Sequence, residues 1–216
     1  MEHLIEGYDV QAFLSEYAEV YHDKEVRIIN AAINAFAEKG FEATPTKEIA
    51  KRAGIAEGTI FRYFPTKDAI LERMVPLLIQ IMQPKMGKPI EDILNLNKDA
   101  PVDRIFAAIL RDRLQMIRDN KRFIKSVLPE LIHRLPLLNL LKQSMLPMIE
   151  GYVDQVVAHG KARGEMDASL DARLVMLQML GFVLSYGMIE TGADKEKEAR
   201  DVEQFIRFVM QGWKPS

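Results

Sequence analysis

The sequence contains no cysteine, which excludes a disulfide framework and a thiolate metal site. Its four histidines, at positions 3, 22, 133 and 159, show no metal-ligand spacing. A Gly-x-Ser-x-Gly elbow, a phosphate loop and a dinucleotide fingerprint are also missing. We therefore expect a protein that is not an enzyme and that uses no metal and no cofactor.

The sequence also lacks a long uninterrupted apolar run and the alternating pattern typical of β-strands. The longest mostly apolar run, residues 174–189, contains Gln178 and Ser185 and falls short of the roughly 20 residues that a membrane span needs. We expect a fully buried helix there. The acidic N-terminus is unlike a signal peptide. These features predict a cytoplasmic all-α protein without a membrane segment, and 216 residues, 48% of them hydrophobic, suffice for a sizeable core in one or two domains.

The segment from Thr44 to Lys67 has the pattern of two short helices around a glycine turn. Thr44 is a suitable N-cap with a proline directly after it, and Gly54 is placed to end the first of these helices. Ile60 and Phe64, four residues apart, give the second helix a buried face. This layout predicts a helix-turn-helix, whose second helix enters the major groove of DNA.

An apolar stripe precedes this segment and predicts a further helix over residues 24–39, with Gly40 after its end and Phe41 folded back onto its last turn. Residues 24–67 carry eight Lys/Arg and five Asp/Glu, a net charge of +3, whereas residues 1–23 carry six acids and no Lys/Arg. A basic segment on an otherwise acidic chain is a modest sign of phosphate binding.

These segments resemble the DNA-binding domain of the tetracycline-repressor (TetR) family. The matching stretches are Arg27-Ile-Ile-Asn-Ala-Ala, Phe36-Ala-Glu-Lys-Gly-Phe, Lys47-Glu-Ile-Ala-Lys-Arg-Ala-Gly-Ile and Gly58-Thr-Ile-Phe-Arg-Tyr-Phe-Pro-Thr-Lys. The resemblance covers about residues 24–71. It implies an all-α homodimer with a small N-terminal reader of palindromic double-stranded operator DNA. It also implies a larger C-terminal domain that binds a small-molecule effector and releases the DNA.

Carried over residue by residue, the resemblance implies DNA contacts at ten positions: Thr44, Thr46, Lys47, Glu57, Gly58, Thr59, Phe61, Arg62, Tyr63 and Lys67. Phe61 stands where the family usually has a tyrosine, which removes a hydroxyl from the phosphate contacts. Glu57 stands where a lysine is frequent. A carboxylate cannot neutralise phosphate, but it can accept from a cytosine amino group or penalise wrong sequences. The operator sequence therefore does not transfer from the family.

The rest of the chain is expected to be helical almost throughout. We expect helices over residues 66–83, 90–95, 101–119, 122–134, 137–162, 170–190 and 194–211, with a loop at 84–89 and a turn at 161–166. Ser169 or Asp167 is the expected cap of the helix at 170. The expected domains are a partly helical N-terminal extension (1–23), the reader (24–71) and the effector-binding and dimerisation domain (72–216).

The last two helices are the expected dimer surface, because a helix that is apolar on more than one face needs more than one neighbour. The residues expected there are Leu174, Leu177, Gly181, Leu184, Met188, Val202, Phe205, Ile206 and Val209. Packing within one chain is the alternative for the same residues.

Flexible methionines and isolated polar groups on apolar helices are the candidates for contact with an apolar or amphipathic effector. They are Met82, Met116, His133, Met148, Tyr152, Gln155, Gln178 and Tyr186, although for any single methionine a place in the core is the more frequent role. Two other functions stay open. One is an all-α small-molecule carrier or enzyme with a vestigial reader, and the other is a DNA-bound scaffold for a protein partner.

Overall fold

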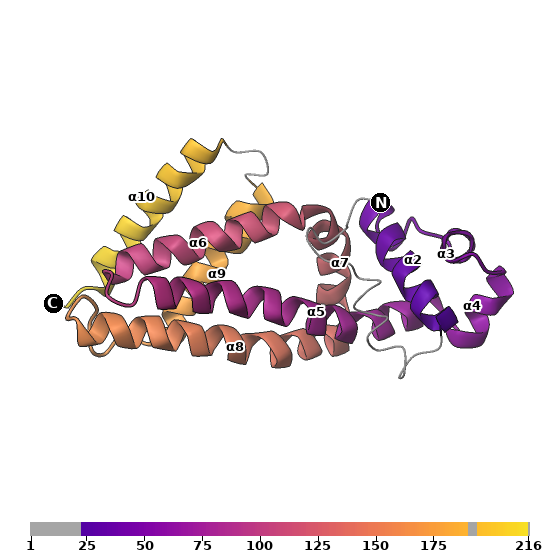
Figure 1. Cartoon of the computed structure of the whole chain (residues 1–216), viewed down its shortest axis with the longest axis horizontal. Coiled ribbons are helices and arrows are strands. Elements are labelled where there is room, and N and C mark those ends of the chain that lie inside the picture. Colours follow the sequence, from indigo (N-terminus) through magenta and orange to yellow (C-terminus); the bar gives the residue numbers. More distant parts are fainter. Residues whose placement is uncertain (1–22, 190–193, 216) are drawn as a thin grey trace. The chain divides into compact units, whose positions relative to one another are not determined.

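The computed structural model describes residues 23–189 and 194–215, and every regular element among them is an α-helix (Figure 1). The all-α prediction is therefore confirmed for this part of the chain. The expected partly helical N-terminal extension lies, up to residue 22, outside the described residues. The chain divides into two compact units, one of residues 1–83 and 119–143 and one of 84–118 and 144–216.

The first unit begins with three helices, α2 (Asp23–Lys39), α3 (Thr46–Ala53) and α4 (Glu57–Tyr63). The apolar stripe on α2 is buried, and Phe36 in its last turns is fully enclosed. Gly40 (φ 84°) and Gly54 (φ 66°) end α2 and α3 in the left-handed conformation that glycine adopts without strain. Phe41 folds back onto Phe36 with 5.0 Å between ring centroids. The three-helix arrangement and both glycine ends are as predicted.

The start of α3 differs from the prediction. Pro45, not Thr44, is the N-cap residue, and no side chain caps the helix. Thr44 is instead fully buried, and its hydroxyl donates to the carbonyl oxygens of Gly40 (2.7 Å) and Ala35 (3.2 Å). The hydroxyl thus ties the connection between α2 and α3 to the last turn of α2 and to the residue that follows it.

Helix α5 (Lys67–Leu96) is continuous, and the loop predicted over residues 84–89 is wrong. Thr66 caps it as predicted, since its Oγ1 accepts from the N–H of Ala69 at 3.0 Å. The helix carries on through Pro84 and Pro89 because tertiary packing outweighs the local cost of the missing N–H groups. Ile90 is buried directly after the second proline.

Helix α7 (Lys121–His133) packs against α2 and closes the first unit. Its helix-breaking signal, Pro129, is tolerated inside the helix. Helix α8 (Leu135–Ala162) follows after one residue, so the expected gap between the helices at 122–134 and 137–162 is the single residue Arg134. Pro136 lies in the first turn of α8, where its missing N–H has no helical partner to lose.

The second unit contains α6 (Val102–Asp119), the later part of α8, α9 (Ala172–Ile189) and α10 (Lys195–Trp213). Phe106 of α6 packs on Trp213 at 5.3 Å between ring centroids. Gly187 brings α9 close to α6, because a Cβ there would lie 2.9 Å from Cγ2 of Ile117. Asp171 begins α9 by accepting from the N–H of Arg173, so the predicted caps Ser169 and Asp167 are wrong. Those two residues bond each other in the preceding turn.

Helix α9 is not the fully buried helix that the sequence predicted. Val175, Met176, Met179 and Val183 are buried, but Leu174 on the opposite face is 57% exposed. By length and composition α9 is the one described helix that could cross a membrane, a test that core helices of other proteins also pass. Its one-sided exposure indicates a helix that packs on its own chain and leaves an apolar face uncovered.

Candidate DNA-binding face and effector domain

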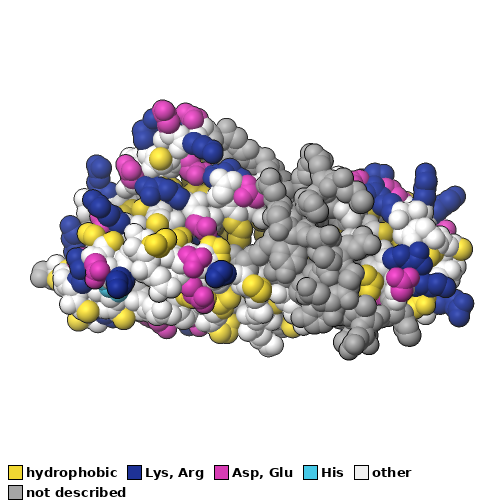
Figure 2. All heavy atoms as spheres, in the orientation of Figure 1, with side chains coloured by type: hydrophobic (Ala, Val, Ile, Leu, Met, Phe, Trp, Pro, Cys, Tyr) yellow, Lys and Arg dark blue, Asp and Glu magenta, His cyan; other side chains and the backbone are white. Residues whose placement is uncertain are grey.

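The exposed side of the reader is basic and aromatic. On α4, Gly58, Phe61 and Arg62 are exposed, and Lys47 and Lys51 are exposed on the neighbouring α3. Figure 2 shows Lys and Arg side chains gathered over α3 and α4. Gly58 has no heavy atom within 4 Å of a would-be Cβ, so it leaves open space on this face. The surface can thus meet phosphates and approach base edges closely.

Three other residues from the predicted DNA-contact set lie deeper. Thr59 and Tyr63 are half-buried, and Tyr63 packs against the core of the first unit. Thr44 is enclosed and does not offer its hydroxyl to a phosphate. We attribute its presence in the family pattern to the α2–α3 connection that it holds.

A hydrogen bond links the two helices across the turn. Oγ1 of Thr46, the first residue of α3, donates to Oε1 of Glu57, the first residue of α4, at 2.8 Å. Both side chains are half-buried. The structure therefore brings together two residues that the sequence placed separately at the DNA.

Lys67 occupies the start of α5, directly after the reader helices. Its Nζ donates to the carbonyl oxygens of Phe41 (2.9 Å) and Glu42 (3.3 Å) and lies 4.3 Å from the centroid of the Phe41 ring. Nζ also lies 3.9 Å from Oε2 of Glu42, so a phosphate would bind the third donor of the ammonium group in competition with this carboxylate. Lys67 thus stabilises the α2–α3 loop and is also a candidate phosphate ligand.

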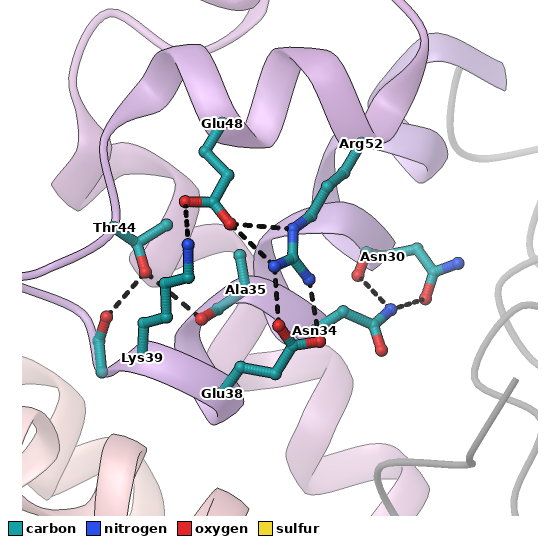
Figure 3. A network of polar contacts seen from close by, with 9 residues as sticks. Asn30, Asn34, Ala35, Glu38, Lys39, Thr44, Glu48 and Arg52 are labelled. Carbon is teal, nitrogen blue, oxygen red and sulfur yellow. Dashed lines mark hydrogen bonds and ion pairs between the residues drawn. The ribbon is translucent and has the colours of Figure 1, made fainter.

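Figure 3 shows an ion-pair network that fastens α3 to α2. The Arg52 guanidinium donates to both carboxylate oxygens of Glu38 (2.9 and 2.6 Å) and to Oε1 of Glu48 (3.1 and 2.7 Å). Lys39 donates to the other oxygen of Glu48 at 2.7 Å. The hydrogen bond from Arg52 lowers the pKa of Glu38, and the bonds from Lys39 and Arg52 lower that of Glu48. The charge of Arg52 is thus balanced within the protein, a role that sequence reasoning missed because Glu38 is fourteen residues away.

A second arginine links the end of α7 to the start of α5. Arg134 donates to Oδ1 of Asp68 (3.1 and 2.7 Å) and to the carboxylate of Glu130, and its guanidinium lies 4.8 Å from the Phe41 ring centroid. Glu130 and Arg134 are four residues apart at the end of α7, a spacing at which opposite charges commonly pair, whereas Asp68 is a partner that the sequence did not reveal. This contact holds the first turn of α5 behind the reader.

The predicted effector residues are not gathered in one pocket. Met82 packs against the core of the first unit, and His133 is exposed at the end of α7. Met116 is half-buried on α6, and Gln155 is exposed on α8. Gln178 accepts from Nε1 of Trp213 at 2.9 Å, and Tyr186 donates to Asp201 at 2.8 Å, so both serve to join α9 to α10.

Two of the predicted effector residues do meet. Tyr152 and Met148 of α8 lie against Gly87 of α5, where a Cβ would be 2.8 Å from the Tyr152 hydroxyl and 3.7 Å from the Met148 sulfur. The hydroxyl donates to Glu91 at 2.7 Å, and burial followed by this bond raises the pKa of Tyr152. The buried Arg113 of α6 donates to the carbonyl of Met86 at 3.0 Å and to Asp112. Polar groups of three helices thus converge here, among them Arg113 and Glu91, which no pattern in the sequence marks as part of a site.

A shallow crevice of about 420 Å³ lies in the first unit. Its lining residues are largely charged or at the α7–α8 junction: Asp68, Glu72, His133, Arg134, Leu135, Pro136 and Leu137. Two acids and an arginine do not suit an apolar effector, because a ligand that covered them would remove charged groups from water. His133 is the only predicted effector residue that borders it.

The predicted dimer residues fall into two groups. Leu177 and Leu184 are exposed together with Leu174, and Gly181 between them is exposed in open space; Met188 is half-buried. Val202, Ile206 and Val209 are instead buried within the chain, so their expected place at the dimer surface is corrected. Phe205 stacks on Phe182 of α9 at 4.1 Å. Phe208, which the prediction omitted, is 74% exposed on α10.

Comparison with known proteins first supports the assignment of the reader, expected over residues 24–71, as a DNA-binding domain. A family model described as bacterial regulatory proteins, tetR family, matches residues 28–74. Over 164 residues the chain is 28% identical to the fatty acid metabolism regulator protein of Bacillus subtilis (strain 168), covering 74% of this chain and 79% of the relative.

Solved structures extend the likeness to the whole fold. The transcriptional regulator FadR from Bacillus subtilis, solved in complex with stearoyl-CoA, superimposes with a TM-score of 0.60 at 26% identity, covering 83% of this chain and 96% of that one. The ketosteroid transcriptional regulator KstR2 of Mycobacterium tuberculosis gives 0.56 at 17% identity, covering 91% and 97%. The second likeness bears on the fold alone. Both proteins are named as transcriptional regulators.

Proposed function

We propose that the chain is a TetR-family regulator, a homodimeric cytoplasmic repressor that leaves its operator when an acyl thioester of coenzyme A binds. The observation that carries DNA binding is the exposed face of α3 and α4, with Lys47, Arg62 and Phe61 around the open position at Gly58. Cations there neutralise phosphates, and the glycine allows a close approach to base edges.

The dimer is proposed from the uncovered apolar face of α9. Leu174, Leu177 and Leu184 are 57%, 50% and 40% exposed. A contiguous apolar strip of this kind favours a partner, and a two-fold axis gives the same strip on both copies. Gly181 at its centre lets two helices approach closely. Two readers joined in this way would meet half-sites one helical turn, about 34 Å, apart on a palindromic operator.

The effector class is proposed from the relatives. FadR from Bacillus subtilis was solved with stearoyl-CoA, and the Bacillus subtilis relative found by sequence is named a fatty acid metabolism regulator protein. The second unit offers an amphipathic ligand both apolar helices and the polar groups around Tyr152 and Arg113. Helix α5 runs without a break from the reader into this unit, so a ligand that shifts its later part can move its first turn.

Calorimetry tests this proposal through reciprocity. Duplexes selected by the purified protein from a genomic library would supply the operator. Stearoyl-CoA should weaken operator binding, and saturating operator must weaken stearoyl-CoA binding by the same factor. Coenzyme A alone is the matched control for the acyl chain. Acyl-CoA binding without any duplex binding at low salt would favour a carrier or enzyme with a vestigial reader, and duplex binding that no acyl-CoA alters would favour a scaffold.

A further inference from the structure

Glu57 places a carboxylate on a surface that is otherwise suited to phosphates. Lys47 and Arg62 are exposed on the same two helices, and Glu57 stands at the first position of α4, where recognition helices contact base edges. A negative charge at this position weakens the attraction to every duplex. We therefore expect Glu57 to make a compensating contribution to binding that depends on the DNA sequence.

The structure shows that this carboxylate is held in place. Oγ1 of Thr46 donates to Oε1 of Glu57 at 2.8 Å, across eleven residues and from a different helix. Both side chains are half-buried, which restricts the rotamers that they can adopt. Among the described contacts Oε2 of Glu57 has no donor, so one oxygen is anchored and the other can accept. A pre-oriented acceptor loses less conformational entropy when it binds than a free glutamate does.

The chemistry of the major groove decides which base such an acceptor selects. Guanine presents two acceptors there, thymine presents an acceptor and a methyl group, and adenine presents an acceptor beside its amino group. A carboxylate is acceptor-only and is repelled by each of these acceptors. Cytosine presents its 4-amino group as a donor without an adjacent acceptor of its own.

We propose that Thr46 and Glu57 form a specificity-determining pair that reads the 4-amino group of one cytosine in each half-site. Glu57 accepts from the base, and Thr46 is the positioning residue that fixes the carboxylate. This inference rests on the proposed operator binding and adds the base that one position of the reader selects. It also explains why α3 and α4 are joined by a side-chain bond at the ends that face the groove.

The structure also allows a competing role for the same bond. The Thr46 hydroxyl is a donor that could otherwise bind a phosphate, and Glu57 would then act as a lock that any duplex must open. If the bond is a lock, a variant that removes it should bind all sequences more tightly and should keep the same base preference. A reading pair changes the preference at one base pair, which gives the two roles different signatures.

The experiment selects duplexes from a randomised library with the full-length protein and with four variants: Glu57→Gln, Glu57→Ala, Thr46→Val and Thr46→Ser. Wild type should require C at one position of each half-site. Glu57→Gln should shift that position towards A, because an amide pairs with both the amino group and N7 of adenine. Thr46→Val should lower discrimination at that position by about fivefold to tenfold, and Thr46→Ser, which keeps the hydroxyl, should restore it.

A base analogue then isolates the contact. Replacing the selected cytosine by pyrimidin-2-one removes only the 4-amino group, and its effect is measured by anisotropy with wild type and with Glu57→Ala. The loss of affinity on this replacement should be about fivefold to tenfold larger for wild type than for Glu57→Ala. Pyrimidin-2-one also weakens base pairing, but this effect is the same for both proteins and cancels when the two losses are compared. Equal losses of affinity in wild type and Glu57→Ala would overturn the proposal that Thr46 and Glu57 read a cytosine. A uniform gain in affinity of the variants for all duplexes, with an unchanged base preference, would overturn it as well. Failure of wild type to bind any duplex would overturn operator binding itself, so the two failures are distinguishable.

Discussion

The arginine at the centre of Figure 3 gives the sharpest stability prediction, Arg52→Met. The substitution keeps much of the apolar stem and removes the guanidinium that binds Glu38 through two bonds of 2.9 and 2.6 Å. The side chains are 28% and 46% exposed. Exposed ion pairs contribute between 0 and about 1 kcal/mol, and a two-bond pair inside a network belongs at the upper end. We therefore expect a loss of about 1 kcal/mol in the free energy that holds α3 on α2.

Hydrogen exchange measures this loss where it occurs. The single tryptophan, Trp213, lies in α10 of the second unit, so its fluorescence does not report on the reader. Protection factors of amides in α2 and α3 should fall about fivefold at pH 7 in Arg52→Met. Lys51→Met, an exposed neighbour in the same helix, is the matched control and should leave them unchanged.

The effect should depend on pH with a definite sign. Arg52 lowers the pKa of Glu38, so the folded carboxyl releases its proton more readily than the unfolded one. Its contribution is present above the unfolded value, about 4.3, and is lost as the pH falls through the lower folded value. The difference between wild type and Arg52→Met should therefore shrink below about pH 4. Equal protection in Arg52→Met and Lys51→Met at pH 7, or a difference between wild type and Arg52→Met that persists at pH 3, would refute the role of Arg52 in holding α3 on α2.

Three further predictions concern DNA, assembly and packing. Lys67→Ala should weaken all duplexes about equally and lower the salt slope by roughly 0.9 per subunit, whereas Lys47→Ala should weaken the operator more than random DNA, both by anisotropy. Leu184→Asp should give monomers in sedimentation and lose affinity for a two-half-site operator, and a dimeric variant would place the interface elsewhere. Gly187→Ala should destabilise by about 1–3 kcal/mol in urea unfolding, because its Cβ would meet Ile117 at 2.9 Å, while Gly151→Ala in open helix should not.

The helices of the reader and their ends could be predicted from local sequence signals. Apolar periodicity placed α2 within one residue of its observed start, and the glycines at 40 and 54 adopt the positive φ that their positions required. These features depend on a residue and its near neighbours in sequence, which is the information that a sequence pattern contains. The same holds for the Thr66 cap of α5.

The errors arise where distant residues decide. Pro84 and Pro89 predicted a loop, but packing around Gly87 and Ile90 keeps α5 helical. Thr44 has the chemistry of an N-cap, yet its hydroxyl is used by carbonyls of the preceding turn. On α10, periodicity identified an apolar seam but could not tell a seam covered within the chain from one left for a partner.

The candidate site was predictable in composition and not in its internal contacts. Residue identity and register indicated the cations and the exposed Phe61 of the DNA face. The bond between Thr46 and Glu57 depends on how α3 and α4 pack, and the pairing of Arg134 with Asp68 joins residues 66 positions apart. Such contacts leave no periodic trace in a single sequence.

The salt dependence of operator binding tests the central claim most directly. Lys47, Lys51, Arg62 and Lys67 offer four cations per reader, so a dimer would neutralise up to eight phosphates. Anisotropy of a selected duplex across salt concentrations should give a log–log slope between about −4 and −7. A slope near zero, or no complex at about 50 mM salt, would contradict the assignment of this face to DNA.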